Sequence, residues 1–390
     1  MIPYGKQDIS QADIDAVVDV LKSDYLTQGP QVPLFEETVA SYCGSEYGVA
    51  VNSATSALHI ACLALGLGEG DWLWTSPNTF VASANCALYC GAQVDFVDIN
   101  PHTYNMSVEA LEHKLQQAKL SNTLPKIVIP VHFAGQSCEM QEIYELSLEY
   151  GFKIIEDAAH AIGGKYLGKP VGGCQYSDIT VFSFHPVKIV TTGEGGVATT
   201  NQADLAEKMQ LLRSHGVTRE PHLMTASSET EGGWYYQQVD LGFNYRMTEM
   251  QAALGVSQMQ RVDEFVSIRK AFAKRYDELL QNLPLTLPFQ HADSDSSFHL
   301  YPILIQTNLM FKNRAQVFKA LRENGIGVNV HYIPVHTQPY YQKMGFTEGD
   351  FPIAESYYQQ AISIPVYQAM TLQNQDTVVD CLAEVLGLTS

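Results

Sequence analysis

The sequence predicts an α/β fold, with a mostly parallel seven-stranded sheet between helices on both faces and a smaller C-terminal α+β domain. Short apolar runs alternate with helical patterns between residues 48 and 200, an alternation typical of parallel sheets. A polar loop at 291–297 precedes a fresh α+β pattern, and the 390 residues exceed what one small core needs. We therefore predict a large domain at 1–255, with segment 1–30 contacting the small domain and the active site, and a small domain at 256–390.

Two helices are expected ahead of the sheet. Ser10 can cap the first, at 10–22, because Asp13 follows three residues later in a capping-box arrangement. A turn at 25–30 separates it from the second helix at 32–43. The first helix carries one apolar stripe, formed by Ile14, Val17, Val18 and Leu21.

The predicted sheet is built from short apolar strands whose carboxyl ends should meet at one edge, where ligands of such sheets bind. Polar residues just after these strands are therefore candidate site residues. The expected strands are 48–51, 72–75, 94–97, 127–131, 153–156, 180–183 and 197–200, with helices at 56–67, 80–90, 107–118 and 139–150.

The C-terminal part begins with a long helical stretch at 247–280, with a break near Val262. Strands are expected at 299–306 and 327–331. Helices are expected at 314–324 and from Asp376 onward.

Composition excludes several classes of protein. A formal charge of −19 and a pI near 4.9 argue against a general nucleic-acid or anionic-membrane surface. The seven cysteines are scattered and never spaced as CxxC, so free thiols are expected and no metal site. The N-terminus lacks the basic start and apolar run of a signal peptide, and no uncharged apolar run reaches the ~18 residues that span a bilayer. These features predict a cytoplasmic enzyme or binding protein.

One lysine stands out, Lys188, in a turn between two apolar strands. The pair His185-Pro186 ends the first strand, and the glycine-rich turn 193–196 leads into the second. A lysine deprived of solvent becomes a usable nucleophile toward carbonyls, and the Schiff base to pyridoxal phosphate (PLP) is one such use. The alternative is an ordinary surface lysine on a connecting loop.

Other candidates follow the predicted strands. Thr55 and Ser56 lie where a helix N-terminus could bind phosphate, and Ser183 could contact the same group. Asp157 ends a buried strand and needs a cation or a donor, such as a protonated pyridine nitrogen. Helix capping is the alternative for Thr55, Ser56 and Asp157, and a purely structural role is the alternative for Ser183. Two neighbours could lie against a cofactor ring or simply pack in the core: His160 and Phe80.

Taken in order, these motifs resemble the DegT/DnrJ/EryC1/StrS family of sugar aminotransferases, which have the type I fold of PLP-dependent transferases. The resemblance runs nearly end to end, and the joint occurrence is far more specific than any single piece. It rests on Leu26-Thr-Gln-Gly-Pro30, Asn52-Ser-Ala-Thr-Ser-Ala-Leu58, Glu156-Asp-Ala-Ala-His-Ala161, Phe182-Ser-Phe-His-Pro-Val-Lys188, Gly193-Glu-Gly-Gly196, Arg213-Ser-His-Gly216 and Asn244-Tyr-Arg-Met247.

The resemblance implies a role for each cofactor residue. Lys188 would be the Schiff-base lysine and general acid/base, Asp157 would pair with the pyridine nitrogen, and His160 would lie beside the ring hydroxyl; these three form the catalytic set. Phe80 would stack on the ring. The phosphate would be held by Thr55, Ser56 and Ser183, joined by Asn244 from the neighbouring subunit of a homodimer with shared active sites.

The resemblance also implies a sugar-nucleotide site. Finer detail in 297–302 and 330–334 is similar to the family branch that acts in pseudaminic acid biosynthesis, and Ala54, where many members carry glycine, fits that branch. Arg219, Arg246 and His331 are candidates to neutralise the pyrophosphate, although Arg246 could equally belong to a buried Arg–Glu pair. The implied substrate contacts are Tyr4, Asp24, Tyr25, Leu26, Thr27, Ala54, Ser183, Asn244, Asn329, Val330, His331 and Tyr332.

The implied reaction moves the amino group of L-glutamate to C4 of a UDP-linked 4-keto-6-deoxy-N-acetylhexosamine, through pyridoxamine phosphate. Its products would be a UDP-4-amino-4,6-dideoxy sugar and 2-oxoglutarate. Alternatives are another nucleotide-linked ketosugar as substrate, or a PLP-binding regulator without turnover. A sugar dehydratase of the same family is disfavoured because those proteins carry histidine in place of Lys188, and the missing dinucleotide fingerprint argues against an NAD-dependent oxidoreductase.

Overall fold

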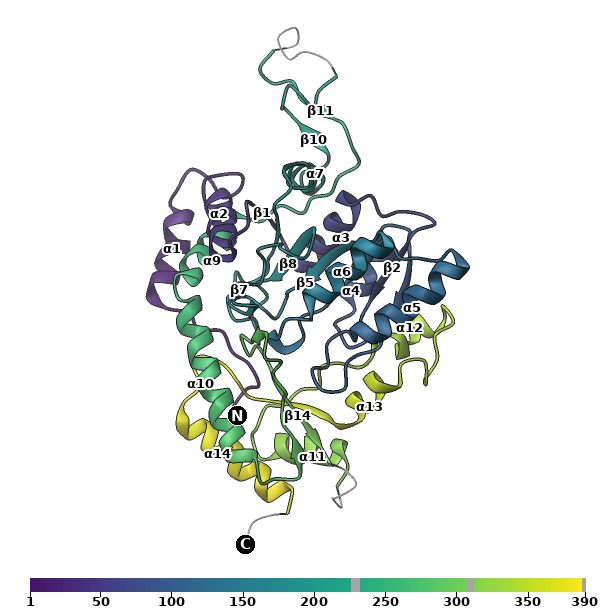
Figure 1. Ribbon diagram of the computed structural model, residues 1–390. Coiled ribbons are helices and arrows are strands. Elements are labelled where there is room, and N and C mark those ends of the chain that lie inside the picture. The colour runs from purple at the N-terminus through teal and green to yellow at the C-terminus, as the bar shows by residue number, and fades with distance from the viewer. Residues whose placement is uncertain (226–231, 307–311, 388–390) are drawn as a thin grey trace.

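A mostly parallel seven-stranded sheet forms the centre of the computed structural model, which describes residues 1–225, 232–306 and 312–387 (Figure 1). The strand order is β1-β9-β8-β5-β4-β2-β3, and only β9 runs antiparallel to its neighbours. The predicted fold class is confirmed, and the predicted strands agree with the observed ones to within two residues at each end. These are β1 (Tyr47–Val51), β2 (Trp72–Thr75), β3 (Gln93–Phe96), β4 (Ile127–Ile129), β5 (Lys153–Asp157), β8 (Ile179–Ser183) and β9 (Gly196–Thr200).

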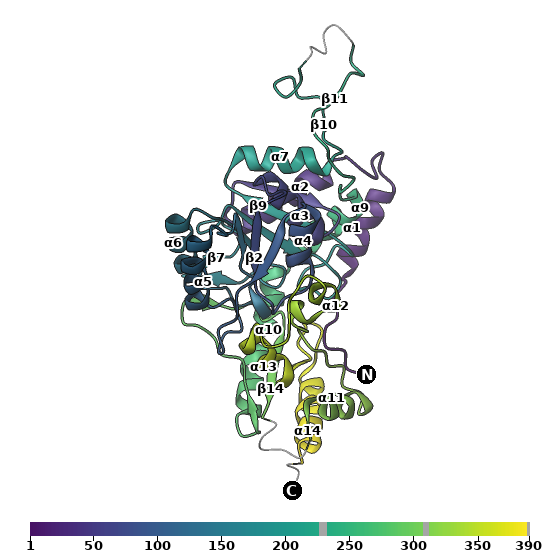
Figure 2. The ribbon, with the colours of Figure 1, turned by 90° about the vertical axis from the view of Figure 1, so that its right-hand side faces the viewer.

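Helices cover both faces of this sheet because alternate strand residues point to opposite sides. In β1, Val49 and Val51 pack in one core with α3 (Ala54–Ala64), whereas Ala50 packs in the opposite core with α2 (Gln31–Cys43). Figure 2 shows the sheet between its two layers of helices. The first layer holds α3, α4 (Ala82–Tyr89) and α7 (Ala203–Arg213), and the second holds α2, α5 (Val108–Ser121), α6 (Met140–Tyr150) and α9 (Glu249–Met259).

The first helix, α1 (Gln11–Leu21), has the predicted capping box, but the two ends of its apolar stripe face outward while Val17 and Val18 are half-buried. Ile14 and Leu21 are 47% and 56% exposed, whereas Asp13 is buried. The Asp13 carboxylate accepts hydrogen bonds from Ser257 Oγ (2.6 Å), Gln258 Nε2 (2.7 Å) and the Arg261 guanidinium (2.7 Å). These hydrogen bonds to the C-terminal end of α9 therefore determine which face of α1 points inward.

A second, three-stranded sheet lies in the C-terminal part, built from β12 (Leu285–Thr286), β14 (Tyr301–Ile305) and β15 (Ala361–Ile364). Helices α11 (Arg314–Glu323) and α14 (Leu372–Val385) pack on it. Two details of the prediction are wrong. The segment 327–331 makes only an isolated bridge, between Asn329 and Ser363, and the last helix starts before Asp376 because Thr371 caps it.

One helix belongs to both halves of the molecule. The predicted long helical stretch is interrupted after Met259, and α10 (Val262–Leu280) follows. Its first turns pack in the core of α2 and α9, whereas its last turns pack in the core of the second sheet. The proposed domain boundary at 255/256 stays a prediction, and the structure adds that α10 connects the two cores.

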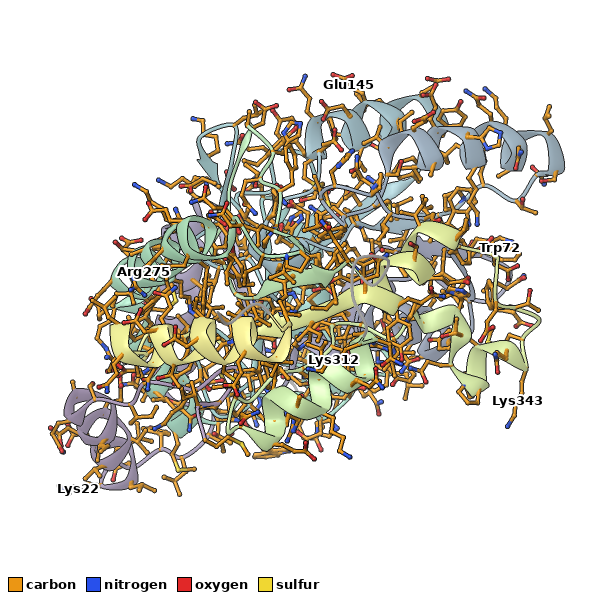
Figure 3. The ribbon with its side chains drawn as sticks, turned by 90° about the horizontal axis from the view of Figure 1, so that it is seen from below. Lys22, Trp72, Glu145, Arg275, Lys312 and Lys343 are labelled. Carbon is orange, nitrogen blue, oxygen red and sulfur yellow. The ribbon has the colours of Figure 1, made fainter. Side chains whose placement is uncertain are left out.

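Two basic residues, Lys312 and Arg275, both labelled in Figure 3, bond the last helix, α14, to its neighbours. Lys312 donates to Val385 O at 2.6 Å, and Arg275 donates to Gln375 Oε1 at 3.0 Å and to Asp376 Oδ1 at 2.5 Å. Charge-assisted bonds at both ends of a helix resist its detachment.

The remaining elements are short. Figures 1 and 2 show β10 and β11 projecting from the body as an arm. No helix within the described ranges is long and apolar enough to cross a membrane. The short elements are β6 (Lys165–Tyr166), β7 (Lys169–Pro170), β10 (Val217–Thr218), β11 (Gln237–Gln238), β13 (Ser294–Asp295), α12 (Pro339–Gln342), α13 (Pro352–Gln360) and the 3-10 turns Phe133–Gly135 and Val335–Thr337.

Replacing Asp13 with alanine is expected to lower the free energy of unfolding by about 2 to 4 kcal/mol, because Arg261 and Gln258 lose a buried acceptor. Urea unfolding followed by circular dichroism measures this. Asp15→Ala, on the exposed side of the same helix, is the matched control and should change the value by less than about 0.5 kcal/mol. Equal effects of the two substitutions would contradict the anchoring role.

Candidate active site

A cavity of about 900 Å³ opens at the carboxyl ends of β1, β5 and β8, the edge at which the sequence placed its candidate residues. Segment 329–332 of the C-terminal part closes one side of it. The cavity brings together most of the predicted site residues, namely Tyr4, Ala54, Thr55, Ser56, Phe80, Asp157, His160, Ser183, Lys188, Asn329, Val330, His331 and Tyr332.

The N-terminus of α3 forms an anion-binding cradle on one wall. Ser53 caps the helix, its Oγ accepting the Ser56 amide at 3.1 Å, and Ser56 Oγ donates to Asn52 Oδ1 at 2.7 Å. The amides of Ala54 and Thr55 have no acceptor in the described chain. Free amides at the positive end of an 11-residue helix favour a phosphate.

The glycine-rich turn packs directly against this cradle. A Cβ on Gly196 would lie 2.6 Å from Ala54 N and 2.7 Å from the Ser53 carbonyl carbon. No side chain fits in that space, so glycine lets β9 start beside the helix N-terminus. The turn thereby holds Lys188 and the cradle on the same side of the sheet.

Asp157, the last residue of β5, is buried and fixed by two donors. Ser83 Oγ donates to Oδ2 at 2.6 Å, and the Ala159 amide donates to Oδ1 at 3.0 Å. No Lys, Arg or His nitrogen in the described ranges lies within ion-pair distance of this carboxylate. A buried carboxylate that opens on a cavity without a counter-ion suits a cationic ligand atom.

Lys188 lies in the turn after β8, and its ammonium has no hydrogen-bond or ion-pair partner in the described part of the chain. Burial lowers the pKa of Lys188 to about 8, although the charge of Asp157 acts in the opposite direction. A lysine with this pKa is partly neutral near physiological pH, so it can act as a nucleophile and as a base.

His160 is locked into one tautomer. The Ala134 amide donates to Nδ1 at 3.3 Å, so Nε2 carries the proton and donates to the Tyr332 hydroxyl at 3.0 Å. Burial, followed by the charge of Lys188, lowers the pKa of His160 well below its usual value. A neutral imidazole therefore connects the sheet edge to the C-terminal segment.

Five predicted residues do not line the cavity of the single chain. Asp24, Tyr25, Leu26 and Thr27 form an exposed turn whose Leu26 carbonyl accepts the Glu249 amide at 3.1 Å. Asn244 is exposed as well, and only its backbone approaches the cavity wall, where Asn52 Nδ2 donates to its carbonyl at 3.4 Å.

The alternative of a buried Arg–Glu pair at Arg246 is wrong. Arg246 forms no ion pair with any described residue. The nearby Glu249 carboxylate instead accepts the amides of Gln31 (2.6 Å) and Val32 (3.3 Å), so it caps α2.

Several cavity residues were not predicted from the sequence. His299 is buried beside His160, with ring centroids 4.5 Å apart. It precedes a strand of the second sheet, and no local pattern indicated that it would reach the first. Ser83 had no signal either, because its partner Asp157 lies 74 residues away. The other unpredicted polar lining residues are Asn52, Ser53, Thr79, His185 and Glu194.

The chain was compared with known proteins. The family model described as "DegT/DnrJ/EryC1/StrS aminotransferase family" matches residues 7–383. A Campylobacter jejuni UDP-4-amino-4,6-dideoxy-N-acetyl-beta-L-altrosamine transaminase is 38% identical over 387 residues, covering 99% of this chain and 98% of its own length.

Two solved structures are similar over the full length. PseC of Helicobacter pylori, described as an aminotransferase involved in the biosynthesis of pseudoaminic acid, has a TM-score of 0.90 and 31% identity and covers 100% of each chain. The PLP-form of Spr1654 from Streptococcus pneumoniae, a putative sugar aminotransferase by its title, has a TM-score of 0.88, 28% identity and the same coverage.

The titration of Lys188 provides a test of this geometry. In the cofactor-free protein, the rate at which an amine-reactive reagent labels Lys188 should rise with pH around a midpoint of about 8. In Asp157→Asn the midpoint should fall below that value, because a nearby negative charge favours the protonated amine. Peptide mass spectrometry measures the labelling, with exposed Lys343 as the internal reference. A midpoint near 10.5, the ordinary lysine value, would show that burial does not act on this amine.

Proposed function

The chain belongs to the DegT/DnrJ/EryC1/StrS aminotransferase family, and we propose that it moves the amino group of L-glutamate to C4 of a UDP-linked 4-keto-6-deoxy-N-acetylhexosamine. The products would be a UDP-4-amino-4,6-dideoxy sugar, of the kind used in pseudaminic acid pathways, and 2-oxoglutarate. The observation that carries this proposal is the unpaired, pKa-lowered Lys188, placed in one cavity with Asp157 and the α3 cradle.

Enzymes of this family use PLP, and the residues of the cavity fit it. The amides of Ala54 and Thr55 suit a phosphate, and Asp157 suits a protonated ring nitrogen. When bound, the cofactor supplies an electron sink for the substrate carbon. We assign the phosphate to Thr55, Ser56 and Ser183, the ring face to Phe80 and the neighbourhood of the ring hydroxyl to His160.

Lys188 is the proposed general acid/base of both halves of the reaction. Its amine would take the α-proton of the donor and later give a proton to C4 of the sugar, which sets the configuration there. One group can do both because a pKa of about 8 lies close to working pH.

The sugar nucleotide is proposed to bind at the mouth of the cavity. Tyr4 and His331 pack together there, with ring centroids 5.5 Å apart, and Tyr332 lies near Phe80 at 6.4 Å. The amide orientation of Asn329 is set because its Oδ1 accepts the Val330 amide at 2.9 Å. These groups, with Ala54, offer neutral donors and apolar surface to a sugar.

A homodimer with shared sites is part of the proposal. Among the described lining residues, the charged side chains are Asp157, Lys188 and Glu194, so this lining offers a pyrophosphate no arginine. Asn244, Arg219 and the turn 24–27 are exposed and could complete the site of a second copy. The projecting β10–β11 arm also exposes Trp234 (75%), which favours contact with another subunit.

Two other functions are compatible with the same fold. The substrate could be another nucleotide-linked ketosugar, because the neutral lining does not by itself select one sugar. A PLP-binding regulator without turnover would keep the cradle and Asp157, but it would not need an amine poised near neutral pH.

Replacing Lys188 with arginine tests the function. The variant should lose turnover by at least about 10³-fold, together with the visible absorbance of the bound cofactor, because arginine cannot deprotonate or form the same bond. Release of 2-oxoglutarate and formation of the amino sugar are measured by mass spectrometry over a panel of UDP- and dTDP-linked 4-keto sugars. Wild-type protein that binds cofactor but releases no 2-oxoglutarate with any of them would indicate a regulator.

Mixing two inactive variants tests the shared site. Lys188→Arg and Asn244→Asp should each be nearly inactive, the second because its carboxylate would face a phosphate. If Asn244 serves the partner's site, unfolding and refolding the two together should restore about a quarter of wild-type activity, since half the dimers are mixed and each has one intact site. Activity no higher than that of the separate variants would place Asn244 in its own chain's site or in none.

A further inference from the structure

The cavity contains little positive charge for a substrate that carries carboxylates. Lys188 is the only Lys or Arg among the described lining residues, and it is proposed to react rather than to bind. His185, at the rim, faces Glu194 Oε1 at 3.8 Å. A carboxylate close to Lys188 must therefore be met mainly by neutral N–H or O–H donors.

Three imidazoles lie close enough to Lys188 for its charge to lower their pKa values. In two of them, both ring nitrogens already make hydrogen bonds within the protein. In His160, Nδ1 accepts the Ala134 amide and Nε2 bonds to Tyr332. In His331, Nε2 accepts from Asn329 Nδ2 at 3.3 Å, so Nδ1 donates to Ser363 Oγ at 2.9 Å.

His299 is the third imidazole, and its ring nitrogens have no partner in the described residues. The ring is 5% exposed and lies against His160, with Nδ1 enclosed by protein and Nε2 open to the cavity. A buried N–H without an acceptor is costlier than a buried lone pair, so the proton belongs on Nε2. His299 thus presents one uncommitted N–H to a ligand.

A buried cation lies directly behind His299. Arg269 of α10 is fully buried, and it donates to the carbonyls of Phe298 (3.3 Å), His299 (3.2 Å) and Val366 (2.9 Å). Burial lowers the pKa of Arg269 to about 9, so it remains charged at neutral pH.

No carboxylate of the described ranges forms an ion pair with Arg269; its remaining bond goes to Gln368 Oε1 at 2.9 Å. An uncompensated charge in a low-dielectric interior stabilises an anion bound nearby. Arg269 lies outside the cavity lining, so its charge acts on the cavity from behind His299, and this favours a carboxylate bound at His299.

We propose that His299 Nε2–H donates a hydrogen bond to the α-carboxylate of the amino-acid donor, with Arg269 as a positioning residue that holds the His299 carbonyl and places a positive charge behind it. The α-carboxylate is favoured over the side-chain carboxylate because it is attached to the carbon whose proton Lys188 takes, so it must lie near Lys188. This inference rests on the proposed aminotransfer from L-glutamate.

Three substitutions of His299 separate the donor from the ring. Phenylalanine keeps an aromatic ring against His160 but has no N–H; glutamine can place an amide N–H near the position of Nε2; asparagine places one near Nδ1. The step to measure is the reaction of L-glutamate alone, followed by the cofactor's visible absorbance in single turnover. His113→Gln, exposed on α5, is the matched control.

The Phe and Asn variants should raise the glutamate concentration for half-maximal rate about 10- to 100-fold, as expected for loss of a hydrogen bond to a charged group. The Gln variant should recover most of this loss. The melting temperature and the cofactor absorbance before glutamate addition should stay close to wild type, as should the half-saturating concentration of the sugar nucleotide.

Donor analogues identify the carboxylate. L-Glutamine keeps the α-carboxylate, whereas L-isoglutamine has an α-amide in its place. His299→Phe should therefore lose about 10-fold or more with glutamate and glutamine but less than about 3-fold with isoglutamine.

Three results would overturn the assignment while leaving aminotransfer intact. They are equal losses with all three compounds, a loss confined to binding of the sugar nucleotide, or no loss at all. Failure of wild-type enzyme to take an amino group from L-glutamate would instead overturn the proposed donor together with this contact.

Discussion

The meeting of strand ends at one edge of the sheet is the constraint on which the site depends. Parallel strands bring their carboxyl ends together, so residues that are far apart in sequence, such as Ser56, Asp157 and Ser183, line one cavity. The antiparallel β9 adds to this arrangement, because the chain must reverse between β8 and β9 at that same edge. Lys188 lies in this reversal, and Gly196 permits the reversal to pack against the α3 cradle.

Burial then gives the cavity its chemistry. Removing solvent makes charged forms costly, so the pKa of Lys188 falls to about 8, and the lowered pKa values of His160 and His331 leave these two imidazoles uncharged at neutral pH. Asp157 keeps its place through two donated hydrogen bonds. The cavity thus consists mostly of neutral donors around one reactive amine. Such a cavity can accept both an amino acid and a sugar, because it strongly repels neither a charged nor a neutral ligand.

The sheet and the cavity residues at its strand ends could be predicted from the sequence because their signals are local, whereas Tyr4, Ala54 and residues 329–332 were expected only from the resemblance to the family. Apolar runs and caps identify strands and helix starts, and Asp157 and Lys188 each follow such a run. The exposure of Ile14 and Leu21 on α1 could not be predicted, because Asp13 finds its partners more than 240 residues away. The same holds for His299, which reaches the cavity because the loop before β14 bonds to a distant turn, with the Ser297 amide donating to Gly135 O and the Leu300 amide to Ala134 O. The turn 24–27 and Asn244 remain predictions, since a single chain does not bring them to the cavity.

The shared helix α10 has a consequence for protein engineering. One route to exchanging sugar specificity between such enzymes is to join the C-terminal part of one relative to the N-terminal part of another. The helix α10 contributes side chains to both cores. A junction just before it would therefore introduce foreign residues into the core of α2 and α9 as well as into the second sheet. A junction after Leu280 preserves the first core but separates Arg269 from the parental residues 298–299 that it holds. In a chimera, Arg269 and the residues 298–299 that accept its hydrogen bonds must therefore come from the same parent.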